Sequence, residues 1–270
     1  MHDTTVTDVH PRPAPPVEKE PGHSVLARLG KRVLRPGGVE LTEAMLAALS
    51  VDRDDDVVEL APGRGATAML TLERGPRSYT GIEADPAWAQ RLERVLGEKG
   101  PVSIAQGDAG ASGLADGCAS VVYGEAMLTM HSARHKARIV AEAARLLRSG
   151  GRYGIHELCI VPDDLDEEAK AAIRRDLSIS IHVGARPLTV SEWRTLLEEA
   201  GLEVRCVETA PMYLLEPRRV VDDEGLARSL MIAANLARLP AERRRVLDMR
   251  RVFREHEAHL AAVALVAAKT

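Results

Sequence analysis

The sequence predicts an α/β fold with a doubly wound, mostly parallel sheet. Strand-like and helix-like segments alternate along residues 55–161, at a spacing that suits parallel strands joined by helical crossovers. The first strand-like run, residues 55–61, leads through a turn with two glycines directly into a helical pattern. Right-handed crossovers would then cover the sheet with helices on both faces.

Five strands are expected in this region because each is a short apolar run bounded by turn residues. Helix-like stretches separate most of them, and Asp85 is expected to cap the helix after the second strand with Pro86 at its first position. Before the first strand we expect a short helix within residues 24–38 and a second over 41–51, capped by Thr42. The expected strands are 55–61, 78–84, 102–109, 118–126 and 152–161.

The alternation loosens after the fifth strand. Residues 163–187 are mostly helical in pattern, and Thr189 with Glu192 forms a capping box for a helix over 189–201. A sixth strand is expected at 202–210 and a last one at 259–269. The sequence therefore predicts a disordered or extended arm over residues 1–22 and one domain over residues 23–270, with helical insertions near 160–190 and 211–257.

Composition narrows the functional classes. The 270 residues carry a net charge of −4 and only 3% aromatic side chains, so the sequence offers neither a basic face nor stacking rings for nucleic acid. No run approaches the roughly 18 apolar residues of a membrane span, and the N-terminus lacks the apolar core of a secretion signal. The three cysteines show no metal-binding spacing. We expect a cytoplasmic protein without a metal, a nucleic-acid partner or a membrane partner.

The glycine-bearing turn at residues 61–65 is the first candidate binding site. Gly63 and Gly65 let a ligand approach the backbone N–H groups at the start of the following helix. The spacing Gly63-x-Gly65-x-x-Ala68 also fits the dinucleotide fingerprint. The turn alone therefore leaves two classes of nucleoside cofactor open.

Three acidic residues favour a positively charged cofactor. Glu59 precedes the turn, where a carboxylate would repel a pyrophosphate but suit a sulfonium. Glu83 ends the second strand, where it can bind both ribose hydroxyls. Asp108 ends the third strand, within reach of an adenine amino group.

These segments resemble the class I S-adenosylmethionine-dependent methyltransferases. "VVELAPGRG" is similar to the first motif of the family, with Ala61 in place of its first glycine, a change that alanine tolerates if its φ is negative. "GIEAD", "GDA", "VVYGEAMLTM" and "LLRSGGRYGIHE" resemble the later motifs in the same order. The resemblance implies a seven-stranded sheet with an antiparallel last strand, and S-adenosylmethionine as cofactor with S-adenosylhomocysteine as product. It implies cofactor contacts from Glu59, Ala61, Gly63, Gly65, Glu83, Ala84, Asp108, Ala109 and Glu125.

Candidate catalytic residues lie at the carboxyl ends of the fourth and fifth strands, where open α/β sheets bind their ligands. Glu125, His131 and His156 are the candidates for acid–base work. Each has an alternative role. Glu125 could contact the methionine part of the cofactor, His131 could cap the following helix, and His156 could be a hydrogen-bonded core residue.

The expected function is methyl transfer from S-adenosylmethionine to a small-molecule acceptor, at an atom that the sequence does not identify. The segment after the fourth strand lacks the Asn/Asp-Pro-Pro-aromatic motif of resembling enzymes that methylate nucleic acid or protein. An NAD(P)-dependent oxidoreductase and a non-catalytic cofactor binder are the alternatives. The helices of 211–257 could form a homodimer face or a wall of the acceptor pocket, with Met231 and Leu236 lining it.

Overall fold

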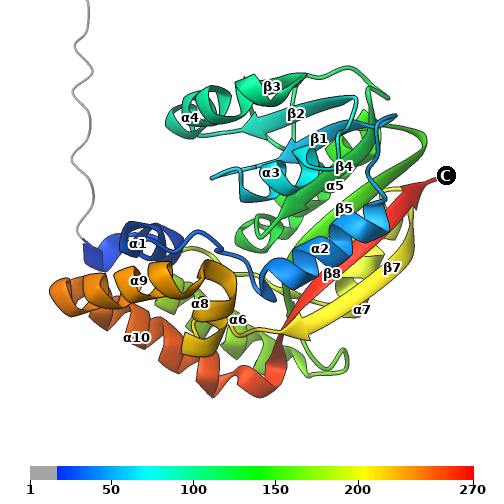
Figure 1. Cartoon of the computed structure of the whole chain (residues 1–270). Coiled ribbons are helices and arrows are strands. Elements are labelled where there is room, and N and C mark those ends of the chain that lie inside the picture. The colour runs from blue at the N-terminus through cyan, green and yellow to red at the C-terminus, as the bar shows by residue number, and fades with distance from the viewer. Residues whose placement is uncertain (1–16) are drawn as a thin grey trace, which may run out of the picture.

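The computed structural model describes residues 17–270 (Figure 1). An arm was expected over residues 1–22, and its residues 1–16 lie outside the described residues. Its last part contains the short helix η1 (Val17–Lys19), and α1 (Gly22–Leu29) begins one residue before the expected start of the domain.

The centre of the fold is one mixed sheet in the strand order β3-β2-β1-β4-β5-β8-β7. The first five strands in that order are parallel, and β8 lies antiparallel to both of its neighbours. The antiparallel last strand is confirmed, and a short strand, β6, adds an eighth strand beside β5. The strands are β1 (Asp56–Leu60), β2 (Ser78–Glu83), β3 (Val102–Gln106), β4 (Ala119–Glu125), β5 (Leu147–Ile160), β6 (Leu188–Thr189), β7 (Leu202–Pro211) and β8 (Leu260–Lys269).

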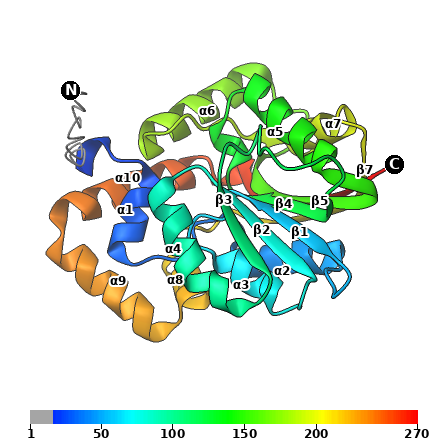
Figure 2. The same ribbon diagram turned by 90° about the horizontal axis from the view of Figure 1, so that it is seen from above.

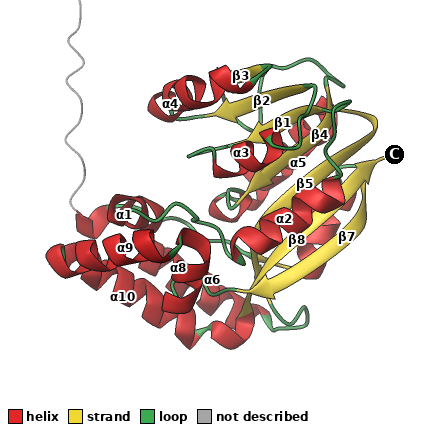
Figure 3. Cartoon of the chain, viewed as in Figure 1, coloured by secondary structure: helices red, strands yellow, loops and turns green. Residues whose placement is uncertain are grey.

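Helices cover both faces of the sheet, as the doubly wound prediction requires (Figure 3). Alternate residues of β1 serve the two cores: Val57 packs with α2 (Gly38–Leu49), α3 (Ala66–Leu72) and α4 (Pro86–Leu96). Val58 packs on the other face, where the core takes in residues of α5 and α7. These two helices are α5 (Ala133–Leu146) and α7 (Val190–Glu198), and the short helices are η2 (Gly97–Lys99), η3 (Leu128–Met130) and η4 (Glu257–His259).

A third group of helices gathers beyond the carboxyl ends of the parallel strands (Figures 1 and 2). It consists of α1 and of helices from the two predicted insertions. No helix of the described residues is both long and apolar enough to cross a membrane. The insertion helices are α6 (Glu167–Ile181), α8 (Pro217–Glu224), α9 (Leu226–Arg238) and α10 (Pro240–Glu255).

The helix caps were predicted correctly at Asp85 and Thr189, but not at Thr42. Helix α2 begins five residues earlier than a Thr42 cap would require, because Gly37 and Gly38 both adopt a positive φ (73° and 71°) that reverses the chain. Thr42 is therefore buried inside the helix, where its hydroxyl donates to Glu125.

Candidate active site

A cavity of about 770 Å³ lies between the carboxyl ends of the strands and the third group of helices. Its sheet side is formed by the residues after β1, β2, β4 and β5, and its other side by α1, α6 and α10. Of the predicted site residues, five line this cavity: Glu59, Ala61, Gly63, Glu83 and Glu125. The others do not: Gly65, Ala84, Asp108, Ala109, His131 and His156.

The turn after β1 holds its backbone in a strained form that leaves room above it. Ala61 has a φ of 56°, so the condition under which alanine would fit without strain is not met. Its N–H donates to the carbonyl of Ile82 at 2.9 Å, which ties the turn to β2. A side chain added at Gly63 would meet only the Ala61 carbonyl, at 3.9 Å, whereas one at Gly65 would lie 2.7 Å from Leu92. Gly63 therefore keeps the cavity open, and Gly65 serves helix packing.

Glu59 lies buried beneath this turn. Its carboxylate accepts hydrogen bonds from the hydroxyl groups of Tyr79 and Tyr123, the latter at 2.7 Å. Burial raises the pKa of Glu59 to about 7, and the two tyrosine hydrogen bonds offset only part of that effect. The side chain is thus poised between its neutral and charged forms near neutral pH.

Glu83 is held in place by backbone groups alone. One carboxylate oxygen accepts from the N–H of Gly63 and the other from the N–H of Asp85, both at 3.0 Å. Each oxygen of a carboxylate can accept two hydrogen bonds, so both keep a free position. The glycine turn and the end of β2 therefore orient this side chain toward a ligand with hydroxyl donors.

Glu125 is surrounded by hydrogen-bond donors. One oxygen accepts from the Thr42 hydroxyl at 2.6 Å and from His156 Nδ1 at 2.7 Å. The other accepts from Arg35 Nη1 at 2.8 Å and from the Thr67 hydroxyl. Burial acts to raise the pKa of Glu125, but the Arg35 charge and the His156 hydrogen bond outweigh it and hold the pKa to about 2. A carboxylate with this pKa is a poor general base at neutral pH.

His156 is fully buried and is not part of the cavity lining, although two residues that line the cavity, Glu125 and Pro36, contact its ring. Its Nε2 faces the Pro36 carbonyl at 2.5 Å, and its Nδ1 faces the Glu125 carboxylate. Both ring nitrogens are therefore occupied by partners within the chain, and neither is free to contact a methyl acceptor. These contacts favour the alternative role of a hydrogen-bonded core residue over a catalytic role for His156.

His131 and Asp108 lie together, away from the cavity. The His131 ring packs on His135 with centroids 4.3 Å apart, and burial followed by the neighbouring His135 lowers the pKa of His131. Ser132, not His131, caps α5. Asp108 is half-exposed, forms an ion pair with Arg138 and accepts from the N–H of Gly110 at 2.8 Å. Neither His131 nor Asp108 is part of the cavity lining.

Glu157, at the end of β5, anchors the loop that follows β4. Its carboxylate accepts from the N–H groups of Met127, Leu128 and Thr129 at 2.7–3.0 Å, and from the Thr129 hydroxyl. Burial raises the pKa of Glu157. Because its four acceptor positions are used, this side chain holds the cavity wall rather than a ligand.

Sequence reasoning missed several residues that line the cavity. Trp88 lines the cavity, and the guanidinium groups of Arg64 and Arg91 lie 5.3 and 5.7 Å from its ring centre. Trp88 follows three residues after the segment Glu83-Ala84-Asp85 at the end of β2. This closeness to a strand end is the sequence feature that could have marked it as a cavity residue. No local signal marked Arg35, because its partner Glu125 is distant in the sequence.

The helical side of the cavity is apolar. The prediction that Met231 and Leu236 line it was wrong: Met231 is exposed and packs near Gly30 on the outer side of α1. Other insertion residues form the wall instead, because α10 and α6 rather than α9 face the sheet. They are Leu177, Ile181, Val183, Met212, Leu214, Met249 and Phe253.

Comparison with known proteins identifies the family. An uncharacterized protein of Haemophilus influenzae is 30% identical over 90% of this chain and 97% of its own length. The family model described as a methyltransferase domain matches residues 57–151, which include the glycine turn, Glu83 and Glu125. The chain belongs to the class I S-adenosylmethionine-dependent methyltransferases. This membership selects S-adenosylmethionine over a nicotinamide cofactor for the glycine turn.

Two further proteins resemble this methyltransferase. The 27-O-demethylrifamycin SV methyltransferase of Amycolatopsis mediterranei is 24% identical over 67% of this chain and 65% of its own length. The structure of a geranyl diphosphate methyltransferase in complex with S-adenosylmethionine superposes with a TM-score of 0.61 at 17% identity, over 86% of this chain and 84% of that one. The second likeness shows that the fold is shared.

Proposed function

We propose that this methyltransferase transfers the methyl group of S-adenosylmethionine to a small molecule with an apolar body. The observation that carries the proposal is a single cavity with two unlike ends. The sheet end holds Glu59, Glu83 and Glu125, and the helical end is formed by the apolar side chains of α6 and α10. A charged cofactor suits the first end and an apolar acceptor suits the second.

The residues at the sheet end fit the cofactor. The free acceptor positions of Glu83 suit the two ribose hydroxyls, and the open space above Gly63 suits close approach of the methionine part. The buried Arg35 lines the cavity, and its Nε has no hydrogen-bond partner among the described residues, so we assign it to the carboxylate of the cofactor. Glu59 supplies negative charge beneath the turn.

S-adenosylmethionine supplies an electrophilic methyl group on a sulfonium. The task of the chain is to orient the acceptor against this methyl group and to exclude water. Such orientation can lower the activation free energy by several kcal/mol, and by up to about 11 kcal/mol in ideal cases. Helices α1, α6 and α10 close the cavity opposite the sheet. The apolar wall favours an acceptor that buries little polar surface.

A hydroxyl or amine acceptor would also need a proton acceptor. Among the lining residues that the structure describes, the carboxylates all accept hydrogen bonds from the chain, whereas His23 on α1 has no such partner. We therefore propose His23 as the general base, in place of Glu125, His131 and His156.

The names of two relatives agree with a small-molecule acceptor, since one is a demethylrifamycin methyltransferase and another a geranyl diphosphate methyltransferase. The remaining expectations stay proposals: a single domain over residues 23–270, a cytoplasmic location, and a homodimer through the 211–257 helices. Several large apolar side chains on α9 and α10 are exposed and suit such a dimer face: Leu226, Leu230, Met231 and Leu247.

The function is tested with S-adenosylmethionine that carries a labelled methyl group, incubated with the protein and a cell extract. We expect the label in the low-mass fraction together with one equivalent of S-adenosylhomocysteine. Label in protein or nucleic acid would contradict the small-molecule acceptor. Cofactor binding without any S-adenosylhomocysteine would favour the non-catalytic binder.

A further inference from the structure

We propose that Arg32 and Arg64 form an anion-binding site at the mouth of the cavity, which takes a carboxylate or phosphate group of the methyl acceptor. Arg32 lies in the segment between α1 and α2, and Arg64 lies in the glycine turn. The two are brought to one cavity from positions 32 residues apart. The assignment to the acceptor rests on the proposed function, but the anion site can be measured without it.

The four arginines that line the cavity fall into two pairs with different surroundings. Arg28 forms ion pairs with Glu20 and Glu242, and Arg35 forms one with Glu125. Among the described residues, no carboxylate lies within 4.0 Å of the guanidinium of Arg32 or Arg64. The one hydrogen bond of the Arg64 side chain goes to the Lys31 carbonyl at 3.3 Å.

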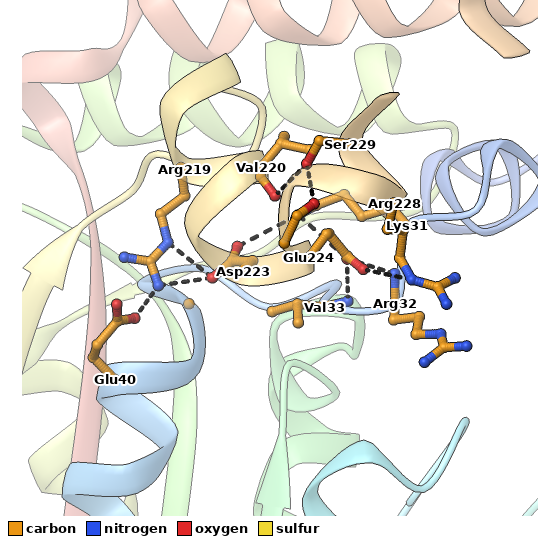
Figure 4. A network of polar contacts seen from close by, with 12 residues as sticks. Lys31, Arg32, Val33, Glu40, Arg219, Val220, Asp223, Glu224, Arg228 and Ser229 are labelled. Atoms are coloured by element: carbon orange, nitrogen blue, oxygen red, sulfur yellow. Dashed lines mark hydrogen bonds and ion pairs between the residues drawn. The ribbon is translucent and has the colours of Figure 1, made fainter. Parts of the chain in front are cut away.

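The acidic residues next to Arg32 are engaged elsewhere (Figure 4). Glu224 on α8 accepts from the backbone N–H groups of Arg32 and Val33 at 2.6 and 2.8 Å. Asp223 accepts from Arg219 at 2.7 Å and from Lys31 at 3.4 Å. These contacts lock the backbone of the segment onto α8, while the Arg32 guanidinium points away from both carboxylates in Figure 4.

Glu83 and Asp85, on the cofactor side of the cavity, do not neutralise these arginines either. The Glu83 carboxylate is held by two backbone N–H groups, and Asp85 accepts from the N–H groups of Ala87 and Trp88 as the cap of α4. Both acids lie more than 4.0 Å from any guanidinium nitrogen of Arg64. The charge of the two arginines is therefore left to water or to a ligand.

Like charges gather around Arg64 and make an anion favourable there. Desolvation lowers the pKa of Arg64, and repulsion from Arg91 and Arg32 lowers it further, while the charge of Glu224 acts in the opposite direction. The Arg64 guanidinium is also positioned over the Trp88 ring, which restricts its orientation. A planar guanidinium held in this way can bind two oxygens of a carboxylate or phosphate at once.

The site is tested by titrating inorganic phosphate into the protein loaded with S-adenosylhomocysteine, measured by calorimetry. We expect the wild type to bind phosphate and the Arg32→Gln/Arg64→Gln variant to bind it at least tenfold more weakly. Arg251→Gln is the matched control, since Arg251 is exposed on α10 and pairs with Glu255. No phosphate binding by the wild type, or equal affinity in the double variant, would overturn the proposal.

Two checks separate this result from other causes. Arg32→Gln alone removes a side chain without a protein partner, so it should weaken phosphate binding while the melting temperature and the affinity for S-adenosylhomocysteine stay unchanged. If S-adenosylhomocysteine instead displaces phosphate from the wild type, the arginines serve the carboxylate of the cofactor and the proposal is wrong. If phosphate binds but no extract yields a methylated product, the proposed function fails while the anion site remains.

Discussion

The carboxylate of Glu125, the last residue of β4, and the imidazole of His156 in β5 are joined by a hydrogen bond of 2.7 Å. The strand register places these two residues directly opposite each other in β4 and β5. On its other side His156 contacts the Pro36 carbonyl, and Glu125 contacts Arg35. The pair therefore fastens the segment before α2 to the sheet, directly beside the cavity.

This arrangement predicts a large loss of stability for Glu125→Gln. The change removes the anion that faces the buried guanidinium of Arg35, and breaking such a pair costs about 3–5 kcal/mol. Urea unfolding followed by circular dichroism measures it. Glu43→Gln, at a half-exposed ion pair with Arg74, is the control and should cost less than about 1 kcal/mol. A loss of similar size in both variants would contradict the account.

The same pair predicts a stability loss in acid. The folded-state pKa of Glu125 is held to about 2, below its ordinary value of 4.5, so the folded protein favours the charged form. Its contribution is complete above pH 4.5 and declines as the pH falls from there toward 2. The difference in urea midpoint between wild type and Glu125→Gln should therefore shrink between pH 5 and pH 3; a constant difference would count against this pairing.

Much of the fold followed from local signals. Periodicity and capping residues predicted β1 to β5, α4, α7 and β8, because the side chains that decide these elements are near in sequence. The antiparallel direction of β8 was implied by the family resemblance alone. Thr42 was misassigned as a cap because its hydroxyl serves Glu125, a partner 83 residues away. The start of a helix can be predicted from nearby sequence only when the capping side chain bonds to the backbone of that same helix.

The candidate site was predicted in part for the same reason. Glu59, Gly63 and Glu83 belong to one strand–turn–helix–strand unit, so their motifs marked them. Arg35, Trp88 and His23 reach the cavity from segments whose placement depends on tertiary packing. The role of His156 could not be decided from the sequence, because a histidine in a strand can point to either face, and here it is fully buried.

Glu83 is predicted to hold the ribose of the cofactor. Glu83→Ala should weaken the binding of S-adenosylhomocysteine by about 1.5–3 kcal/mol, since hydrogen bonds to a charged group are lost. Calorimetry measures the change. Glu93→Ala, on the exposed face of α4, should leave the affinity unaltered. Unchanged affinity in Glu83→Ala would mean that the ribose lies elsewhere.

Glu59 is predicted to make cofactor binding depend on pH. Its pKa is raised to about 7, so it is largely protonated at pH 6 and charged at pH 8. A sulfonium favours the charged form, so the affinity for S-adenosylmethionine relative to uncharged S-adenosylhomocysteine should rise by up to about tenfold over that range. Calorimetry with both ligands at each pH measures the ratio. A ratio that rises equally in Glu59→Gln would show that another group titrates.

His23 is predicted to act as the general base for the acceptor. His23→Gln should lower kcat by about 10²-fold or more and leave the affinity for S-adenosylhomocysteine unchanged. Higher pH should restore part of the lost rate, because the acceptor then ionises without help. An unaltered kcat would mean that the acceptor needs no base. His182→Gln, at the end of α6 and outside the cavity lining, is the control.

A crystal structure with S-adenosylhomocysteine tests the central claim most directly. The account predicts that the two ribose hydroxyls lie on the Glu83 carboxylate and that the sulfur faces the apolar wall of Ile181, Met249 and Phe253. A ribose bound away from Glu83, or a sulfur that does not face this apolar wall, would contradict the account.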